Sequence, residues 1–243
     1  MDSSDFEAAF SLPFARDSSL DTVVVGSLVT LASFTTPLAG VLLAGYVVRL
    51  VRAGFGGASA LPLFDDLADM AVEGARLSAV FVVLQLPALA LVTLVLGSSS
   101  ASLTVAAAVS DPQILQYLDV SVFDVLGLAL AGIAALGGAY LTAAATVALA
   151  SERSFAASIP LIRGLASDTS FVSVVSASAL VVFGGRLLGF FVGTSPVAGV
   201  VFTACVSFLT LVAAATLLGR GMRQSEVDTW TDQQPAFAGV ESA

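Results

Sequence analysis

The stretch Val125-Leu-Gly-Leu-Ala-Leu-Ala-Gly-Ile-Ala-Ala-Leu-Gly-Gly-Ala-Tyr-Leu-Thr-Ala-Ala-Ala-Thr-Val-Ala-Leu-Ala150 decides the fold class, because it holds no charged residue from end to end. About 20 consecutive apolar residues are enough for a helix to cross a hydrocarbon layer about 30 Å thick. Buried helices of soluble proteins are seldom apolar for so long. This stretch therefore predicts a transmembrane helix.

Other apolar regions flank this stretch, at 22–48, 77–96, 171–192 and 197–218. Across the chain 57% of residues are hydrophobic and 11% are charged, whereas roughly 25% are charged in an average soluble domain. We therefore expect an all-α, polytopic transmembrane helical bundle in the lipid bilayer of the cell membrane. Its expected divisions are an N-terminal interfacial segment (1–21), a transmembrane helical domain (22–219) and an acidic, disordered cytoplasmic tail (220–243).

The region 22–48 is interrupted by Pro37 and Gly40. Its length exceeds one span, while each half is too short for one at about 1.5 Å per residue. It can form a hairpin of two short helices or a single helix kinked at Pro37. The segment from Pro37 to Val41 is similar to the one from Pro196 to Val200, so Pro196 and Gly199 take the matching hinge or turn positions. Duplication and chance both explain this likeness.

Arginine placement separates the two alternatives, because basic residues near span ends concentrate on the cytoplasmic side. With the hairpin the chain crosses the membrane six times, and every Arg except Arg186 faces the cytoplasm together with both termini. With a single kinked helix, Arg16 and the N-terminus move outside. We therefore expect the hairpin, with both termini in the cytoplasm.

Three segments beside the spans mix apolar and charged residues. In the segment 61–76, Phe64, Leu67 and Ala71 share one helical face while Asp66 and Glu73 fall on another. This pattern is typical of an amphipathic helix lying in the membrane interface. We expect interfacial helices here and at 6–16 and 155–168, although short polar connectors would explain the last two as well.

The charge balance of the sequence indicates adaptation to a high-salt solution. All nine basic residues are Arg, and 18 acidic residues bring the net charge to −9. Strong acidity without Lys keeps proteins hydrated in very high salt, where screening removes their self-repulsion. We therefore expect a salt-loving archaeal source and no nucleic-acid partner.

Arg186 is the one charge well inside an apolar region, and burying an ionisable group in a membrane is expensive. Its side chain can snorkel to the headgroups or contact an anionic lipid, pair with Asp124 within the membrane, or bind a substrate. Asp124 is the proposed partner because it opens the span that begins on the same outer side. The acidic residues between Asp65 and Glu73 could also bind a cation or a basic partner, but solvated surface is the more common role of such clusters.

Small residues recur every four positions on two of the expected spans, which lets helix backbones approach closely. These faces can pack within the chain or form the interface of a homo-oligomer. The candidate packing residues are Gly185, Gly189, Gly193, Gly127, Ala131 and Ala135.

An ordered series of short motifs resembles the domain of unknown function 4013 family, multi-span membrane proteins found in archaea and mainly in haloarchaea. The series consists of Ala9-Phe10, Pro13-Phe14, Pro37-Leu-Ala-Gly40, Gly45-Tyr46-Val-Val-Arg49, Arg52, Leu61-Pro62 and Phe64-Asp65-Asp66, followed by Glu152 and Phe155-Ala156-Ala157. The resemblance implies a membrane protein with no assigned activity.

Enzyme motifs are missing from the sequence. It has no phosphate-binding glycine loop, no Gly-x-Ser-x-Gly elbow and no His, and Cys205 is its single cysteine. We expect no catalytic residue, cofactor or metal. The leading hypothesis is a non-enzymatic scaffold, accessory subunit or membrane-organising protein that binds a membrane partner. The alternative is a small-molecule transporter or channel with a site near Arg186.

The hairpin can be tested by topology. A short epitope fused to the N-terminus should be reached by antibody only after the cells are permeabilised, because six crossings return both ends to the cytoplasm. The same epitope at the C-terminus is the matched control. Labelling of the N-terminal epitope on intact cells would contradict the hairpin.

Overall fold

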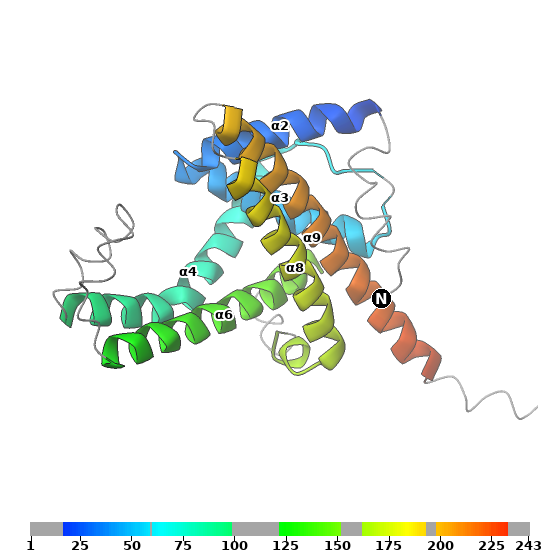
Figure 1. Cartoon of the computed structure of the whole chain (residues 1–243). Helices are drawn as coiled ribbons and strands as arrows, with labels where there is room; N and C mark the ends of the chain where they lie inside the picture. Colours follow the sequence, from blue (N-terminus) through cyan, green and yellow to red (C-terminus); the bar gives the residue numbers. More distant parts are fainter. Residues whose placement is uncertain (1–16, 59, 99–121, 152–161, 193–197, 233–243) are drawn as a thin grey trace, which may run out of the picture. The chain divides into compact units, whose positions relative to one another are not determined.

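The computed structural model describes residues 17–58, 60–98, 122–151, 162–192 and 198–232, and no strand occurs among them. The main helices, shown in Figure 1, are α2 (Asp17–Ser33), α3 (Pro37–Phe55), α4 (Leu67–Ser98), α6 (Val122–Ala150), α8 (Thr169–Val192) and α9 (Ala198–Asp232). The all-α prediction is therefore confirmed.

Five of these helices are long and apolar enough to cross a membrane: Pro37–Phe55, Leu67–Val95, Val122–Ala150, Thr169–Phe191 and Gly199–Arg223. The apolar part of α2, Leu20–Ser33, is shorter. Large apolar side chains lie on the outside of the helices, including Phe190, Leu136 and Leu180. This surface suits lipid, so the chain is a polytopic helical membrane protein.

The helices divide into two compact units, one made of residues 1–78 and 143–243 and the other of residues 79–142. The division falls inside α4 and inside α6. In the smaller unit, Gln85 Nε2 donates a hydrogen bond to the Ala135 carbonyl oxygen at 3.3 Å. Val95 and Gly127 form a second contact, so these parts of α4 and α6 pack antiparallel.

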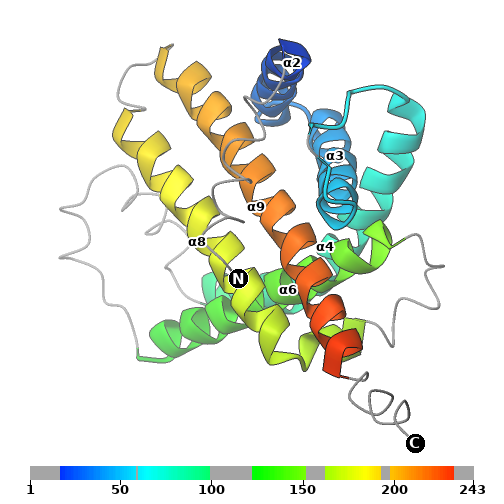
Figure 2. The ribbon, with the colours of Figure 1, turned by 90° about the vertical axis from the view of Figure 1, so that its right-hand side faces the viewer.

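Helix α9 forms the core of the larger unit. It packs against α8, α3 and α2, and α2 also packs against α3; Figure 2 shows α8 and α9 running side by side. The membrane-length part of α9 is 44% buried, more than any other span. Its buried face carries Ala204, Phe208, Val212 and Ala215, spaced three or four residues apart as one helical face requires.

Residues 22–48 form two helices that pack on one another. Helix α2 ends at Ser33, and α3 begins with Pro37 in its first turn. The Thr36 amide donates to the Ala32 carbonyl oxygen at 2.8 Å and closes the turn. Proline suits this position because its missing N–H would have no helical partner there. This arrangement is a hairpin of helices, and the sixth crossing stays a prediction because α2 is short.

Helix α3 approaches two neighbours closely at glycines. A Cβ added to Gly45 would overlap the Met70 carbonyl oxygen, and one added to Gly74 would overlap the Val41 carbonyl oxygen. At the other end of α3, Gly54 lies against Gly219 of α9. The three backbones can approach this closely only because no side chain separates them.

Two differences from the sequence-based expectations concern helix length. The segment Leu67–Arg76 is not a separate interfacial helix, because α4 continues through it and past Pro87 as a single helix. Helix α9 continues to Asp232 and so includes the first part of the predicted tail. No proline interrupts that part, and Met222 is buried within it. Residues 233–243 lie outside the described residues, as do 6–16 and 155–161, the first half of the segment 155–168.

The close approach of α3 to α4 predicts a difference between two identical substitutions in one helix. Gly45→Ala should lower the free energy of unfolding by about 1–3 kcal/mol, because the new methyl group overlaps a backbone carbonyl. Gly40→Ala has open space within 4 Å of its new methyl group, so its effect should be neutral or slightly stabilising. Unfolding of both variants by titration with SDS is the measurement. Equal effects would contradict the close approach.

Candidate functional site

The candidate site is a network of charges at the C-terminal end of α3. Arg49 Nη1 donates to the Asp65 carbonyl oxygen at 2.7 Å and to Asp65 Oδ1 at 3.0 Å. Its Nη2 donates to the Asp66 carbonyl oxygen at 3.1 Å, and its Nε lies 3.9 Å from Glu73 Oε2. The Arg49 side chain is 16% exposed. This guanidinium therefore fixes the irregular segment 61–66 against α3.

Arg52 lies one turn later on α3 and contacts two other helices. Its Nη2 donates to Glu73 Oε1 of α4 at 2.9 Å, and its Nε donates to the Ala150 carbonyl oxygen of α6 at 3.2 Å. Ala150 is the last residue of α6, where helix carbonyls lack intrahelical partners. Glu73 thus accepts a hydrogen bond from Arg52 and forms a longer ion pair with Arg49, while its Oε2 atom has no hydrogen-bond partner among the described residues.

A cluster of three aromatic rings, from Tyr46, Phe64 and Phe208, also holds the segment 61–66 against α3 and α9. The rings of Tyr46 and Phe64 stack with centroids 4.2 Å apart, and the Phe208 ring of α9 lies 5.7 Å from that of Tyr46. The Tyr46 hydroxyl donates to the Pro62 carbonyl oxygen at 3.1 Å. Such offset aromatic contacts add about 0.5–1.5 kcal/mol per pair beyond area burial.

Helix α9 brings further arginines to this end of the larger unit. Arg220 Nη2 donates to the Ala58 carbonyl oxygen at 3.4 Å. Arg223 is exposed, and a Cβ at Gly57 would overlap its guanidinium. Arginines from α3 and α9 therefore gather at one end, although they are far apart in sequence.

A hollow of about 560 Å³ opens beside the network, and Arg49, Arg52, Asp69 and Glu73 line it. Within the described part of the chain, no group of three or more acidic or cysteine side chains is placed to hold a metal ion. The described residues that line the hollow carry charges of both signs and include no nucleophile with an activating base. Its chemistry suits recognition of a charged partner.

Arg186 lies apart from this network, in the last third of α8. It lines a cavity of about 110 Å³ together with residues of α2, α3 and α9. Asp124 belongs to the first turn of α6, in the smaller unit. Their pairing stays a prediction.

The predicted packing residues have the following neighbours. Gly185 and Gly189 face Thr210 and Thr203 of α9. On α6, Gly127 faces Val95, Ala131 is buried and Ala135 accepts the hydrogen bond of Gln85. Gly193 lies outside the described residues.

The predicted hinge residues lie at helix starts. Pro37 and Gly40 occupy the first turn of α3, and Gly199 is a buried residue in the first turn of α9. Pro196 lies outside the described residues.

Sequence reasoning did not identify the network as a site. It treated Arg49 and Arg52 as topology markers and the acids as solvated surface. The spacing of Arg49 and Arg52, three residues apart on one helix, was a usable signal because both side chains share a face. Nothing in the sequence shows that Glu73 faces them.

Comparisons with known proteins identify a family for this chain but no activity. Residues 28–194 match a family described as "Protein of unknown function (DUF4013)". No curated protein and no solved structure matches the chain.

The shared carboxylate predicts unequal effects of two neutralising substitutions in α4. Glu73→Gln should lower the free energy of unfolding by about 1–2 kcal/mol, because two partly buried guanidiniums lose their common anion and water screens part of the loss. Asp69→Asn is the matched control, one turn away and exposed. A double-mutant cycle with Arg52→Gln measures the coupling. Additive effects in the cycle would contradict a direct ion pair.

Proposed function

We propose that this chain, which belongs to the DUF4013 family of proteins of unknown function, is a non-enzymatic membrane scaffold that presents a fixed charged surface to a partner protein. The observation that carries the proposal is Glu73 held between Arg49 and Arg52. An ion-paired network of this kind keeps its charges in place before a partner arrives. Preorganised charges favour selective recognition, because little ordering remains to be done on binding.

The exposed edge of this network is acidic. Asp65 is 74% exposed although it pairs with Arg49, and Asp66 and Asp69 are exposed as well. Exposed carboxylates attract the arginine or lysine side chains of a partner. The partner in this proposal is a membrane or membrane-bound protein with a basic segment, or a second copy of the chain that offers Arg223.

The proposal also places the network in the cytoplasm, at the plasma membrane. Its support is that Arg49, Arg52 and Arg220 gather at one end of the larger unit. Arginines near span ends concentrate on the cytoplasmic side. The surplus of acidic residues over basic ones, 18 against nine, further suits a salt-rich archaeal cell.

A transporter is the second candidate, because the cavity beside Arg186 lies between spans of the larger unit. Transport predicts flux of a solute through proteoliposomes and its loss on Arg186→Gln. Scaffolding predicts that growth defects of a deletion strain are rescued by Arg186→Gln and not by Glu73→Gln.

Photo-crosslinking in native membranes tests the scaffold directly. A photoreactive phenylalanine at Leu63, exposed in the segment next to the network, should yield one recurrent crosslinked protein. Glu73→Gln should reduce that yield several-fold, because the segment loses its anchor. The partner is then identified by mass spectrometry.

The control carries the same probe at Leu180, which is 71% exposed on α8. This position should yield lipid adducts only. The same crosslinked proteins at both positions, or an unchanged yield with Glu73→Gln, would overturn the proposal.

A further inference from the structure

The cavity beside Arg186 is lined by one charged residue, several residues with hydroxyl groups and several apolar residues. It measures about 110 Å³, and Thr30, Ser33, Ser207 and Thr210 line it together with Arg186 and apolar residues. A water molecule occupies about 30 Å³ of liquid volume. The cavity therefore has room for a small polyatomic group.

Arg186 has no partner of its own there. Its guanidinium makes no hydrogen bond or ion pair with the residues that the structure describes, whereas Arg49 and Arg52 reach both carboxylates and carbonyls. A guanidinium carries five N–H donors in a planar fork that matches oxyanions. A charge at membrane depth without a counter-charge is unfavourable, so an anionic ligand would stabilise it.

The hydroxyl groups of the lining residues differ in whether they are free to donate a hydrogen bond to a ligand. Thr30, Ser33 and Thr210 donate to carbonyl oxygens of their own helices. The Ser207 hydroxyl makes no hydrogen bond within the described part of the chain, so it is free to donate. Arg186 and Ser207 therefore supply the donors, on α8 and α9 respectively.

Two other buried hydroxyls lie one turn from lining residues on α2 and α8. Ser27 Oγ and Ser178 Oγ are buried without a hydrogen-bond partner. Ser27 lies one turn before Thr30 on α2, and Ser178 lies one turn before the lining residue Val182 on α8. Buried polar groups usually have partners, so these two hydroxyls are exceptions among the described residues.

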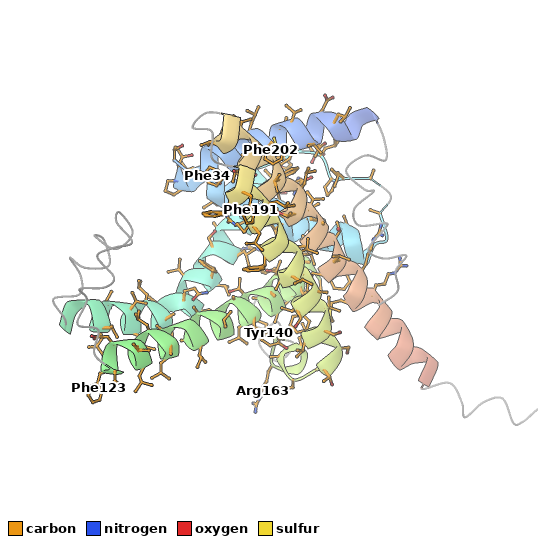
Figure 3. All side chains as sticks on the ribbon, in the orientation of Figure 1. Phe34, Phe123, Tyr140, Arg163, Phe191 and Phe202 are labelled. Atoms are coloured by element: carbon orange, nitrogen blue, oxygen red, sulfur yellow. The ribbon has the colours of Figure 1, made fainter. Side chains whose placement is uncertain are left out.

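The depth of the cavity fits a phosphate group. Arg186 lies five residues before Phe191, the last residue of that span, or about 7–8 Å along a helix that rises about 1.5 Å per residue. An arginine side chain reaches the headgroup level from this depth. Figure 3 shows Phe191 at this end of α8 and Phe202 near the start of α9.

We propose that Arg186 and Ser207 bind a phosphate group in this cavity, either the headgroup phosphate of a membrane lipid or free inorganic phosphate. The two sources share one chemistry, a tetrahedral oxyanion held by a guanidinium and a hydroxyl. This site is independent of the proposed scaffold, because it uses no residue of the Arg49, Arg52 and Glu73 network.

Native mass spectrometry of the full-length protein tests the site. The protein is released from detergent containing equal amounts of dioleoyl phosphatidylglycerol and dioleoyl glycerol, which differ in the phosphate. Retention of the phospholipid should exceed that of the neutral lipid and should fall about tenfold with Arg186→Gln, the loss expected for one charge-assisted hydrogen bond. Titration of lipid-free protein with inorganic phosphate forms the second arm.

The possible outcomes separate the two sources of phosphate from the absence of a site. Phospholipid retention without phosphate binding assigns the site to lipid, and phosphate binding that Arg186→Gln abolishes assigns it to the free anion. Equal retention of both lipids, together with no phosphate binding, overturns the proposal. Arg163→Gln is the matched control, an exposed arginine outside the cavity, and should leave both measurements unchanged.

A second variant tests the site independently if Arg186→Gln does not fold. Ser207→Leu keeps the arginine but fills the cavity and removes the second donor. Binding reduced several-fold in this variant, with an unchanged circular dichroism spectrum, supports the site. Binding equal to that of the wild type overturns it.

Discussion

The backbone of α3 touches α4 near Gly45 and Gly74 and touches α9 near Gly54 and Gly219. Because no side chain lies between the backbones at these points, rotamer changes cannot adjust the spacing, and the register of the helices is fixed. Arg49 and Arg52 lie between the two contacts on α3. Their distances to Glu73 are therefore set by the same glycines that bring α3 and α4 together.

The charge network follows from what a partly buried guanidinium requires. Two arginines share one glutamate, so the remaining donors need neutral acceptors. The carbonyl oxygens of Asp65, Asp66 and Ala150 supply them at the start of α4 and the end of α6. The Asp66 oxygen also accepts from the Met70 amide. The irregular segment before α4 is thus an acceptor surface for Arg49, and the positive φ of 49° at Asp66 is held by the bonds around it.

The sequence was sufficient to predict the helices but not to predict which helices and side chains contact one another. Uninterrupted apolar length predicted the spans, and Pro37 predicted the break between α2 and α3, because both depend on local chemistry. The continuity of α4 was missed because charges such as Asp69 and Glu73 suggested a separate interfacial helix, whereas pairing of Glu73 with α3 lets one helix include them. Gly45 and Gly74 were overlooked for a similar reason. An isolated glycine indicates a close approach only when the facing backbone is known.

The two arginine sites of the larger unit differ in the source of their negative charge. At the end of α3 the chain provides it, through Glu73 and Asp65, and the site is complete within the fold. At Arg186 the described residues provide hydroxyls and no carboxylate, although the free-energy cost of an unpaired charge is higher within a span than at its end. A guanidinium in that position is stable only if it reaches the interface or receives an anion from outside the chain. The Arg186 end of the larger unit therefore depends on its surroundings, whereas the α3 end carries its own counter-charges.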